Sequence, residues 1–387
     1  MFELLFLLLP IAAAYGYYMG RSSVSSQRQE VQSKKNVTYL RGVEYLLNND
    51  KDRAVDKFIA YLNESDPSFE TSLALGNLFR QRGEVDKAIS VHESLSLNTE
   101  YESAQIEIAK LELARDFLSA GLLDRAEIIL TALVDIPRQR RNAASLLVTL
   151  YEYEHDYNRA IKAALDYQND LGDIVIRKLS NFYCQRAESE EASGEDDKAL
   201  ASLQRAIDVD KDSIRARYLL SLRYIRAKDF VKALELQRQI SSIDHDAGLV
   251  CLEILQKIYT NKADLKYRIE LEDLVRRTLS SAAIVELVEV IELTGSVHDA
   301  KLLLTSYIKD RPNLKLFSAL MRLRSKELDA SANDAILQLK SLVDAQIASS
   351  AQYSCCRCGF ESKMLFWQCP SCRRWNTLKA IRGLAGD

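Results

Sequence analysis

Residues 76–88 read Gly-Asn-Leu-Phe-Arg-Gln-Arg-Gly-Glu-Val-Asp-Lys-Ala. In this stretch an aromatic residue, Phe79, follows the small residue Gly76 by three positions, and a second glycine, Gly83, comes five positions before Ala88. Glycine permits the left-handed backbone of a tight turn, and alanine lets a neighbouring helix approach closely. The stretch therefore predicts two antiparallel helices joined by a tight turn, with Ala88 in the middle of the second helix.

The same pattern recurs along the chain. Its small central residues are Ala54, Ala88, Ala126, Ala160, Ala199, Ala233 and Ala300, separated by 34, 38, 34, 39, 34 and 67 residues. The last interval covers two repeats, with Tyr267 at the intermediate centre. A period of about 34 residues resembles the tetratricopeptide repeat, here over roughly residues 35–345. The resemblance implies an all-α, right-handed superhelical solenoid with a concave groove. Eight repeats are expected, with a degenerate ninth.

Composition agrees with a helical chain. Among 387 residues there are 13 glycines and 5 prolines, too few for a fold rich in turns. The net charge is −3, with 28% charged residues of mixed sign. A nucleic-acid-binding protein normally carries a basic field, so this charge argues against that class.

Two cysteine pairs lie close together near the C-terminus, Cys355 with Cys358 and Cys369 with Cys372. A C-x-x-C turn brings two sulfurs within reach of one ion, and a second pair completes a tetrahedral shell around Zn²⁺. The segment between the pairs is long enough for a short hairpin and too short for a core. The metal should therefore supply the folding energy, on the order of 10–16 kcal/mol.

The site is expected to hold one structural zinc ion, and iron in a rubredoxin-like electron carrier is the alternative. Cys356 would form a poorer C-x-C pair with Cys358 and is interpreted as a free thiol. Both tryptophans, Trp367 and Trp375, lie in this module and should cap the metal site or anchor the module to another surface. The module, residues 350–387, carries six basic and two acidic residues, so an acidic partner or anionic lipid is one expectation and a solvated tail is the other.

The N-terminal stretch from Phe2 to Met19 is apolar except for Glu3. Its length is close to the minimum for one helical span, so residues 1–20 are predicted to be a transmembrane anchor and residues 21–34 a linker. The first positive charges follow the span, which predicts an inner-membrane protein with a periplasmic N-terminus and a cytoplasmic array at 35–349. A cleaved signal peptide is the alternative, although no basic residue precedes the apolar run.

The tetratricopeptide pattern implies that first-helix residues face the groove. In that register the residues expected to contact a partner are Asn77, Arg80, Arg115, Tyr153 and Arg226. A basic groove with aromatic residues suits an extended acidic segment. Charge reversal at Arg80 and Arg115 should then weaken partner binding and leave thermal stability nearly unchanged.

The order of parts, together with the motif C-x-x-C-G-F … W-Q-C-P-S-C-x-x-W, resembles the lipopolysaccharide assembly protein B family of Gram-negative bacteria. The resemblance implies a cytoplasmic scaffold that acts as an adaptor for the membrane protease FtsH and promotes proteolysis of LpxC, the zinc deacetylase of lipid A synthesis. It also implies an opposing inner-membrane sensor protein and, among further partners, lipopolysaccharide export proteins. An oligomer is compatible with the sequence.

Catalytic motifs of the common nucleotide-binding, serine-hydrolase and zinc-protease types do not occur in the sequence. The chain is therefore predicted not to be an enzyme. A rubredoxin-like redox protein, a zinc-ribbon nucleic-acid binder and a general protein scaffold at the inner membrane are the alternative functions.

Overall fold

The computed structural model describes residues 68–327 and 329–387, and, before them, residues 40–45, 47, 48, 50, 53, 56 and 57. The predicted anchor at residues 1–20, the linker at 21–34 and the first repeat centre, Ala54, lie outside the described residues. The chain divides into two compact units, Met1–Leu171 and Gly172–Asp387, and each is described separately.

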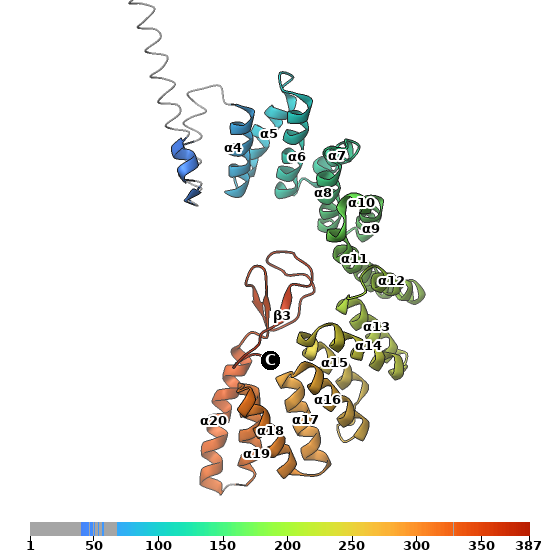
Figure 1. The fold of residues 1–387 in the computed structure, drawn as a ribbon, viewed down its shortest axis with the longest axis vertical. Helices are drawn as coiled ribbons and strands as arrows, with labels where there is room; N and C mark the ends of the chain where they lie inside the picture. Colours follow the sequence, from blue (N-terminus) through green and yellow to red (C-terminus); the bar gives the residue numbers. More distant parts are fainter. Residues whose placement is uncertain are drawn as a thin grey trace, which may run out of the picture. The chain divides into compact units, whose positions relative to one another are not determined.

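The described part of the chain is mostly helical, as the composition predicts (Figure 1). In the first unit the helices are α4 (Phe69–Gln81), α5 (Val85–Leu97), α6 (Ser103–Ala120), α7 (Leu123–Val134), α8 (Arg140–Tyr153), α9 (Tyr157–Asp166) and the short α10 (Gln168–Leu171). In the second unit they are α11 (Asp173–Ala192), α12 (Asp196–Val209), α13 (Ile214–Arg226), α14 (Phe230–Ile243), the 3₁₀ turn η1 (His245–Ala247), α15 (Gly248–Ile258), α16 (Leu265–Thr278), α17 (Ser281–Thr294), α18 (Val297–Asp310), α19 (Leu314–Ser325) and α20 (Ala330–Ser349).

Within each unit successive helices pack as hairpins, and neighbouring hairpins contact one another. The first helices of neighbouring hairpins touch one another, α4 with α6 and α6 with α8 in the first unit, and α11 through α13, α15, α17 and α19 in the second. One wall of each unit is therefore built from first helices. Each hairpin leaves an apolar face that only the following hairpin buries, which is the packing expected of a repeat array.

The predicted repeat centres are at the closest packing points of the hairpins. Every described alanine of the series is completely buried; these are Ala88, Ala126, Ala160, Ala199, Ala233 and Ala300. Tyr267, at the intermediate centre, is 1% exposed. The sequence period thus locates residues that are buried between the two helices of a hairpin.

The turn within each hairpin has the same backbone in five of the described repeats. The residue five positions before the centre has a positive φ: Gly83 (82°), Gly121 (74°), His155 (57°), Gly194 (77°) and Lys228 (59°). The next residue donates its N–H to a carbonyl in the last turn of the first helix, as Glu84 does to Phe79 (2.9 Å) and Asp229 to Tyr224 (2.8 Å). This is the Schellman helix ending, in which glycine relieves the left-handed strain.

Three short strands follow α20. They are β1 (Tyr353–Cys355), β2 (Glu361–Ser362) and β3 (Leu378–Ala380), and they form an antiparallel sheet in the order β2-β1-β3. Tyr353 pairs with Ser362 on one side and with Ala380 on the other. The segment between Ser362 and Leu378 connects β2 to β3 and carries the second cysteine pair.

The predicted inner-membrane location needs correction. No helix in the part of the chain that the structure describes has the length and apolar character required to cross a membrane. This finding contradicts the prediction of a single-pass protein with a periplasmic N-terminus, which was made from residues outside the described range.

Lys228, a non-glycine residue in a left-handed turn, provides a test of the repeat geometry. We expect Lys228→Gly to stabilise the second unit by about 1 kcal/mol, because an L-residue in this conformation carries a strain that glycine lacks. The reverse change, Gly121→Ala, should destabilise the first unit by a similar amount. Urea unfolding followed by circular dichroism measures both; no difference between the two variants would contradict the assigned turn.

Candidate metal centre and its contacts with the repeats

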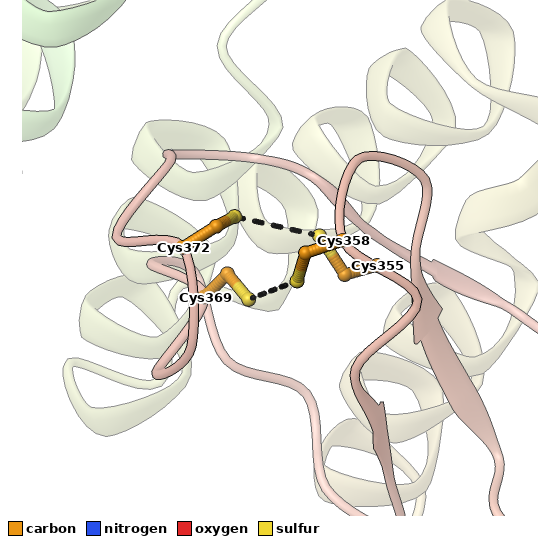
Figure 2. Close-up of side chains that lie close together, drawn as sticks. All are labelled: Cys355, Cys358, Cys369 and Cys372. Carbon is orange, nitrogen blue, oxygen red and sulfur yellow. Dashed lines mark hydrogen bonds between the residues drawn. The ribbon is translucent and has the colours of Figure 1, made fainter. Parts of the chain in front are cut away.

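The four predicted ligands lie together at the tip of the strand module (Figure 2). All four sulfur atoms are within 4.8 Å of one another. Cys355 Sγ lies 3.7 Å from Cys372 Sγ, and Cys358 Sγ lies 3.6 Å from Cys369 Sγ. A tetrahedral zinc site with Zn–S bonds of about 2.3 Å has sulfur–sulfur edges of about 3.8 Å. The sulfurs are therefore already spaced for one Zn²⁺ ion.

Two equivalent turns hold these sulfurs. In the first, Gly359 donates its N–H to the Cys355 carbonyl (3.0 Å) and has φ 75°. In the second, Arg373 donates to the Cys369 carbonyl (2.8 Å) and has φ 54°. Glycine is the usual residue in a left-handed turn, whereas the arginine at position 373 carries no sequence signal for one.

The environment already favours ionisation of part of the ligand set. Burial opposes ionisation of Cys355, but its hydrogen bond with Thr377 and those from the backbone N–H groups of Cys358 and Arg357 outweigh burial and lower the pKa of its thiol to about 6. Backbone hydrogen bonding at Phe360 likewise lowers the pKa of Cys358. Burial raises the pKa of Cys369 to about 11. That thiol becomes a thiolate only through the metal's own charge.

The apolar core of the module is very small. Only Cys355, Cys369 and Leu378 are fully buried in it, with Tyr353, Phe360, Leu365 and Phe366 packed around them. Two of the three buried side chains are metal ligands, so removing the metal removes most of the core. One structural zinc ion is the cofactor that this site fits.

The module is not a solvated tail, since both tryptophans anchor it to the repeats. The ring of Trp375 meets the ring of Phe182 in α11 edge to face, with centroids 6.5 Å apart, and the Arg215 guanidinium in α13 lies 5.2 Å from the Trp375 centroid. The ring of Trp367 lies 5.8 Å from that of Tyr218 in α13. Aromatic and cation–π contacts of this kind add to the burial of the rings.

The basic residues of the module also contact the repeats. Lys379 forms an ion pair with Asp244, and Arg382 with Asp246 at 2.9 Å. Arg382 additionally donates to the carbonyl oxygens of His245 (3.0 Å) and Thr278 (3.3 Å). Two of the basic residues that were expected to contact an acidic partner or a lipid surface are therefore paired with acidic residues of the chain itself.

The last five residues lie between the starts of two repeat helices. Asp387 accepts hydrogen bonds from Ser280 Oγ (2.9 Å) and from the Ala282 N–H (3.0 Å) at the start of α17. Asn313 donates to the Gly383 carbonyl (2.8 Å) and to the Gly386 carbonyl (3.1 Å). Carboxylates stabilise helix N-termini in this position. The sequence did not predict the contacts of Asp387, because Ser280 and Ala282 lie more than a hundred residues before it.

A cleft of about 540 Å³ lies where the module meets the repeats. The module lines it with both tryptophans, Phe366, Arg357 and Cys356, and the repeats with Arg177, Asp210 and Asp212 among others. Cys356 is exposed there and is not one of the clustered ligands. The cleft combines aromatic surface with charges of both signs, which is typical of sites for protein segments.

Among the residues predicted to contact a partner, Arg80 is already engaged within the first unit. It donates to Asp116 Oδ1 (2.7 Å) and Glu112 Oε2 (2.5 Å), and it contacts Asn77. Asp116 is completely buried and also bonds to His92 Nδ1 at 2.5 Å. The His92 ring occupies the space where a side chain at position 76 would lie, since a Cβ there would be 2.4 Å from Nε2.

The other predicted contact residues are more accessible. Arg115 is 42% exposed and lies 3.5 Å from Glu112, and Tyr153 is 36% exposed. Arg226, in the second unit, is 61% exposed and paired with Glu191. Whether these residues or Asn77 contact a partner stays a prediction.

Comparisons with known proteins cover the whole chain. A profile described as the rubredoxin metal binding domain matches residues 353–380. Lipopolysaccharide assembly protein B of Escherichia coli strain K12 is 34% identical over 388 residues, which is 100% of both chains. Lipopolysaccharide assembly protein B of Haemophilus influenzae is 32% identical over 98% of both chains.

Among solved structures, the crystal structure of MamA is 18% identical, covers 44% of this chain and 94% of its own, and has a TM-score of 0.34. A structure of Naa15/Naa10 bound to HypK is 15% identical, with 80% and 53% coverage and a TM-score of 0.37.

The metal site leads to a direct prediction. Replacing any one of Cys355, Cys358, Cys369 or Cys372 by Ser should remove a stoichiometric zinc ion, because a structural site requires all four thiolates. The repeats should keep their helical circular dichroism signal. The melting temperature should fall, because the unfolded module no longer contacts α11, α13, α17 and α19. Elemental analysis and thermal melting measure these effects.

Cys356→Ser is the matched control and should keep both zinc and melting temperature. Loss of zinc in Cys356→Ser with retention in Cys355→Ser would mean that the first turn binds through a C-x-C pair. A coloured protein with thiolate-to-iron absorption bands would identify iron as the resident metal.

The position of Arg80 changes the expectation for charge reversal. Arg80→Glu would place a third carboxylate beside Glu112 and the buried Asp116, and breaking a buried pair costs about 3–5 kcal/mol. Arg115→Glu should change the free energy of unfolding by only about 0.5 kcal/mol, as expected for a surface site. Urea unfolding of the two variants separates these outcomes; equal stability would mean that the Arg80–Asp116 contact is not formed in solution.

Proposed function

This chain belongs to the lipopolysaccharide assembly protein B family, and from that premise we propose that it acts as a non-enzymatic protein adaptor in lipopolysaccharide assembly. The full-length similarity supports a role shared by the whole chain rather than by one module. The observation that carries the adaptor role is the cleft between the zinc module and the repeats. Residues of both parts line this cleft, so the two parts form one continuous surface.

The chemistry of the metal site supports a structural rather than a catalytic role for zinc. Four thiolates occupy the four positions of a tetrahedral ion, so no position stays open for a water molecule or a substrate. Folded around the ion, the module presents Trp367 and Trp375 to the repeats. The metal therefore shapes a protein-binding surface.

The more specific proposal concerns regulated proteolysis. We infer that the adaptor presents LpxC to the FtsH protease, so that the supply of lipid A precursor falls when the adaptor is active. An inner-membrane sensor protein would oppose this action, and lipopolysaccharide export proteins would be further partners. This proposal follows from the family resemblance together with a surface suited to protein segments.

We place the client contact at the cleft. The clustered ligands are separate from the exposed Cys356, so a change at position 356 can alter the cleft without altering the ion. Arg357 and Arg177 contribute exposed positive charge and Asp210 and Asp212 negative charge, which suits a client segment that carries both signs. Aromatic rings next to these charges provide the buried anchor points that protein interfaces use.

A pair of substitutions at one position tests this proposal in cells that lack the native gene. Cys356→Trp should fill the cleft, keep zinc, and lengthen the half-life of LpxC at least several-fold relative to the unmodified chain. Cys356→Ser should restore the normal half-life, since it leaves the cleft open. Immunoblotting after translation is blocked measures the half-life, and elemental analysis of the purified variants confirms the metal.

The results distinguish the two levels of the proposal. Normal LpxC turnover with Cys356→Trp would remove the cleft as the client site. An LpxC half-life that does not depend on the presence of the chain at all would remove the proteolysis role.

A further inference from the structure

Helix α20 carries an unusually apolar surface for the last helix of a repeat array. None of the side chains that the structure describes in it, at positions 332–349, is fully buried. Leu337, Leu339 and Leu342 are 43%, 55% and 71% exposed. Its only charged residues are Asp334, Lys340 and Asp344. Terminal helices of such arrays normally present a polar outer face, so this surface calls for a covering element.

One side of α20 is accounted for by its own hairpin. Ile336, Val343 and Ile347 are half-buried, and Asp344 accepts a hydrogen bond from Ser318 of α19 at 2.5 Å. Among the described elements, α20 packs extensively only against α19, and Figure 1 shows the two as the final hairpin. The exposed leucines lie outside this contact.

The residues next to that side, all exposed except the half-buried Ala332, follow a heptad pattern. Small, apolar or uncharged residues recur at alternating intervals of three and four, namely Ala332, Ala335, Leu339, Leu342, Gln346 and Ser349. This spacing places them in one stripe along the helix, the stripe that a second helix contacts in a coiled coil. We call these six residues the α20 seam.

The seam is complementary to itself. When two copies of α20 run antiparallel about a point between Leu339 and Leu342, each of these leucines lies opposite the other leucine of the second copy, and Ala335 lies opposite Gln346. A two-fold symmetric contact requires this kind of self-matching surface. We propose that the α20 seam is a homodimer interface, and that its partner is the seam of a second copy of this chain.

The charges around the seam agree with pairing between identical copies. The positions that flank it, Ile336, Gln338, Val343 and Ala345, are all uncharged. Coiled coils that select a different chain use opposite charges at these positions, and like charges there prevent self-pairing. The flanks of the α20 seam therefore carry no charges that would attract a different chain, and no like charges that would repel an identical one.

The size of the seam predicts how tight the dimer is. A helix of 20 residues is about 30 Å long and 10 Å wide, so pairing along it buries on the order of 300 Å² on each copy. Stable interfaces bury about 800 Å² on each partner, so this dimer should be reversible and depend on protein concentration.

Photo-crosslinking of the full chain in cells tests the proposal. Two copies with different epitope tags are expressed together, and Leu339 of one is replaced by the photoreactive residue p-benzoylphenylalanine. Irradiation should give a product of twice the 43.9 kDa chain mass that carries both tags. The matched control is position 302 in α18, where Leu302 is 59% exposed but belongs to no such stripe, and it should give no such product.

A second measurement uses the unlabelled protein. Sedimentation equilibrium of the purified chain should show a monomer–dimer equilibrium, and the double variant Leu339→Glu with Leu342→Glu should raise the dissociation constant at least ten-fold while the helical signal is unchanged. Leu302→Glu should leave the constant as it is. A crosslink from position 339 within one chain, to a protein of another mass, or to nothing would overturn the proposal, as would equal dissociation constants for the two glutamate variants.

Discussion

In six of the described hairpins the two helices pack closely because the second helix carries a small residue where they cross. Ala88, Ala126, Ala160, Ala199, Ala233 and Ala300 have no exposed surface, and a larger side chain at any of them would force the helices apart. This steric constraint fixes the hairpin, and the hairpin fixes which side of the first helix faces the next repeat. Contacts such as that of Arg80 with Asp116, across two neighbouring first helices, depend on that spacing.

The zinc module follows a different physical rule, since it has almost no apolar core of its own. Metal–thiolate bonds take the place of buried hydrocarbon, and the remaining stability comes from contacts with the repeats. Trp375 lies against Phe182 and Arg215, and Lys379 and Arg382 pair with Asp244 and Asp246. Unlike isolated surface ion pairs, which contribute little, these pairs act together with buried aromatic rings and helix-capping hydrogen bonds.

The sequence predicted the features that depend on local pattern. The period of about 34 residues located the buried alanines, and the doubled C-x-x-C spacing located the four sulfurs that the structure brings together. Features that depend on distant partners were not predictable in this way. Arg80 has the spacing of a groove residue, yet its partner Asp116 lies 36 residues away and is completely buried. Asp387 caps a helix that begins 106 residues earlier, and nothing in its local sequence announces it.

The contacts of the module make the ion and the repeats thermodynamically linked. Zinc binding is coupled to folding of the module, and the folded module is what places Trp367 and Trp375 on the repeats and Asp387 at the start of α17. Any protein segment that binds the cleft contacts both the module and the repeats, so it binds only the folded, docked form. By mass action such a segment must then increase the apparent affinity for zinc, and zinc must increase the affinity for the segment by the same factor. In the proposed function the metal would therefore act on partner binding without contacting the partner, through the surface that it keeps assembled.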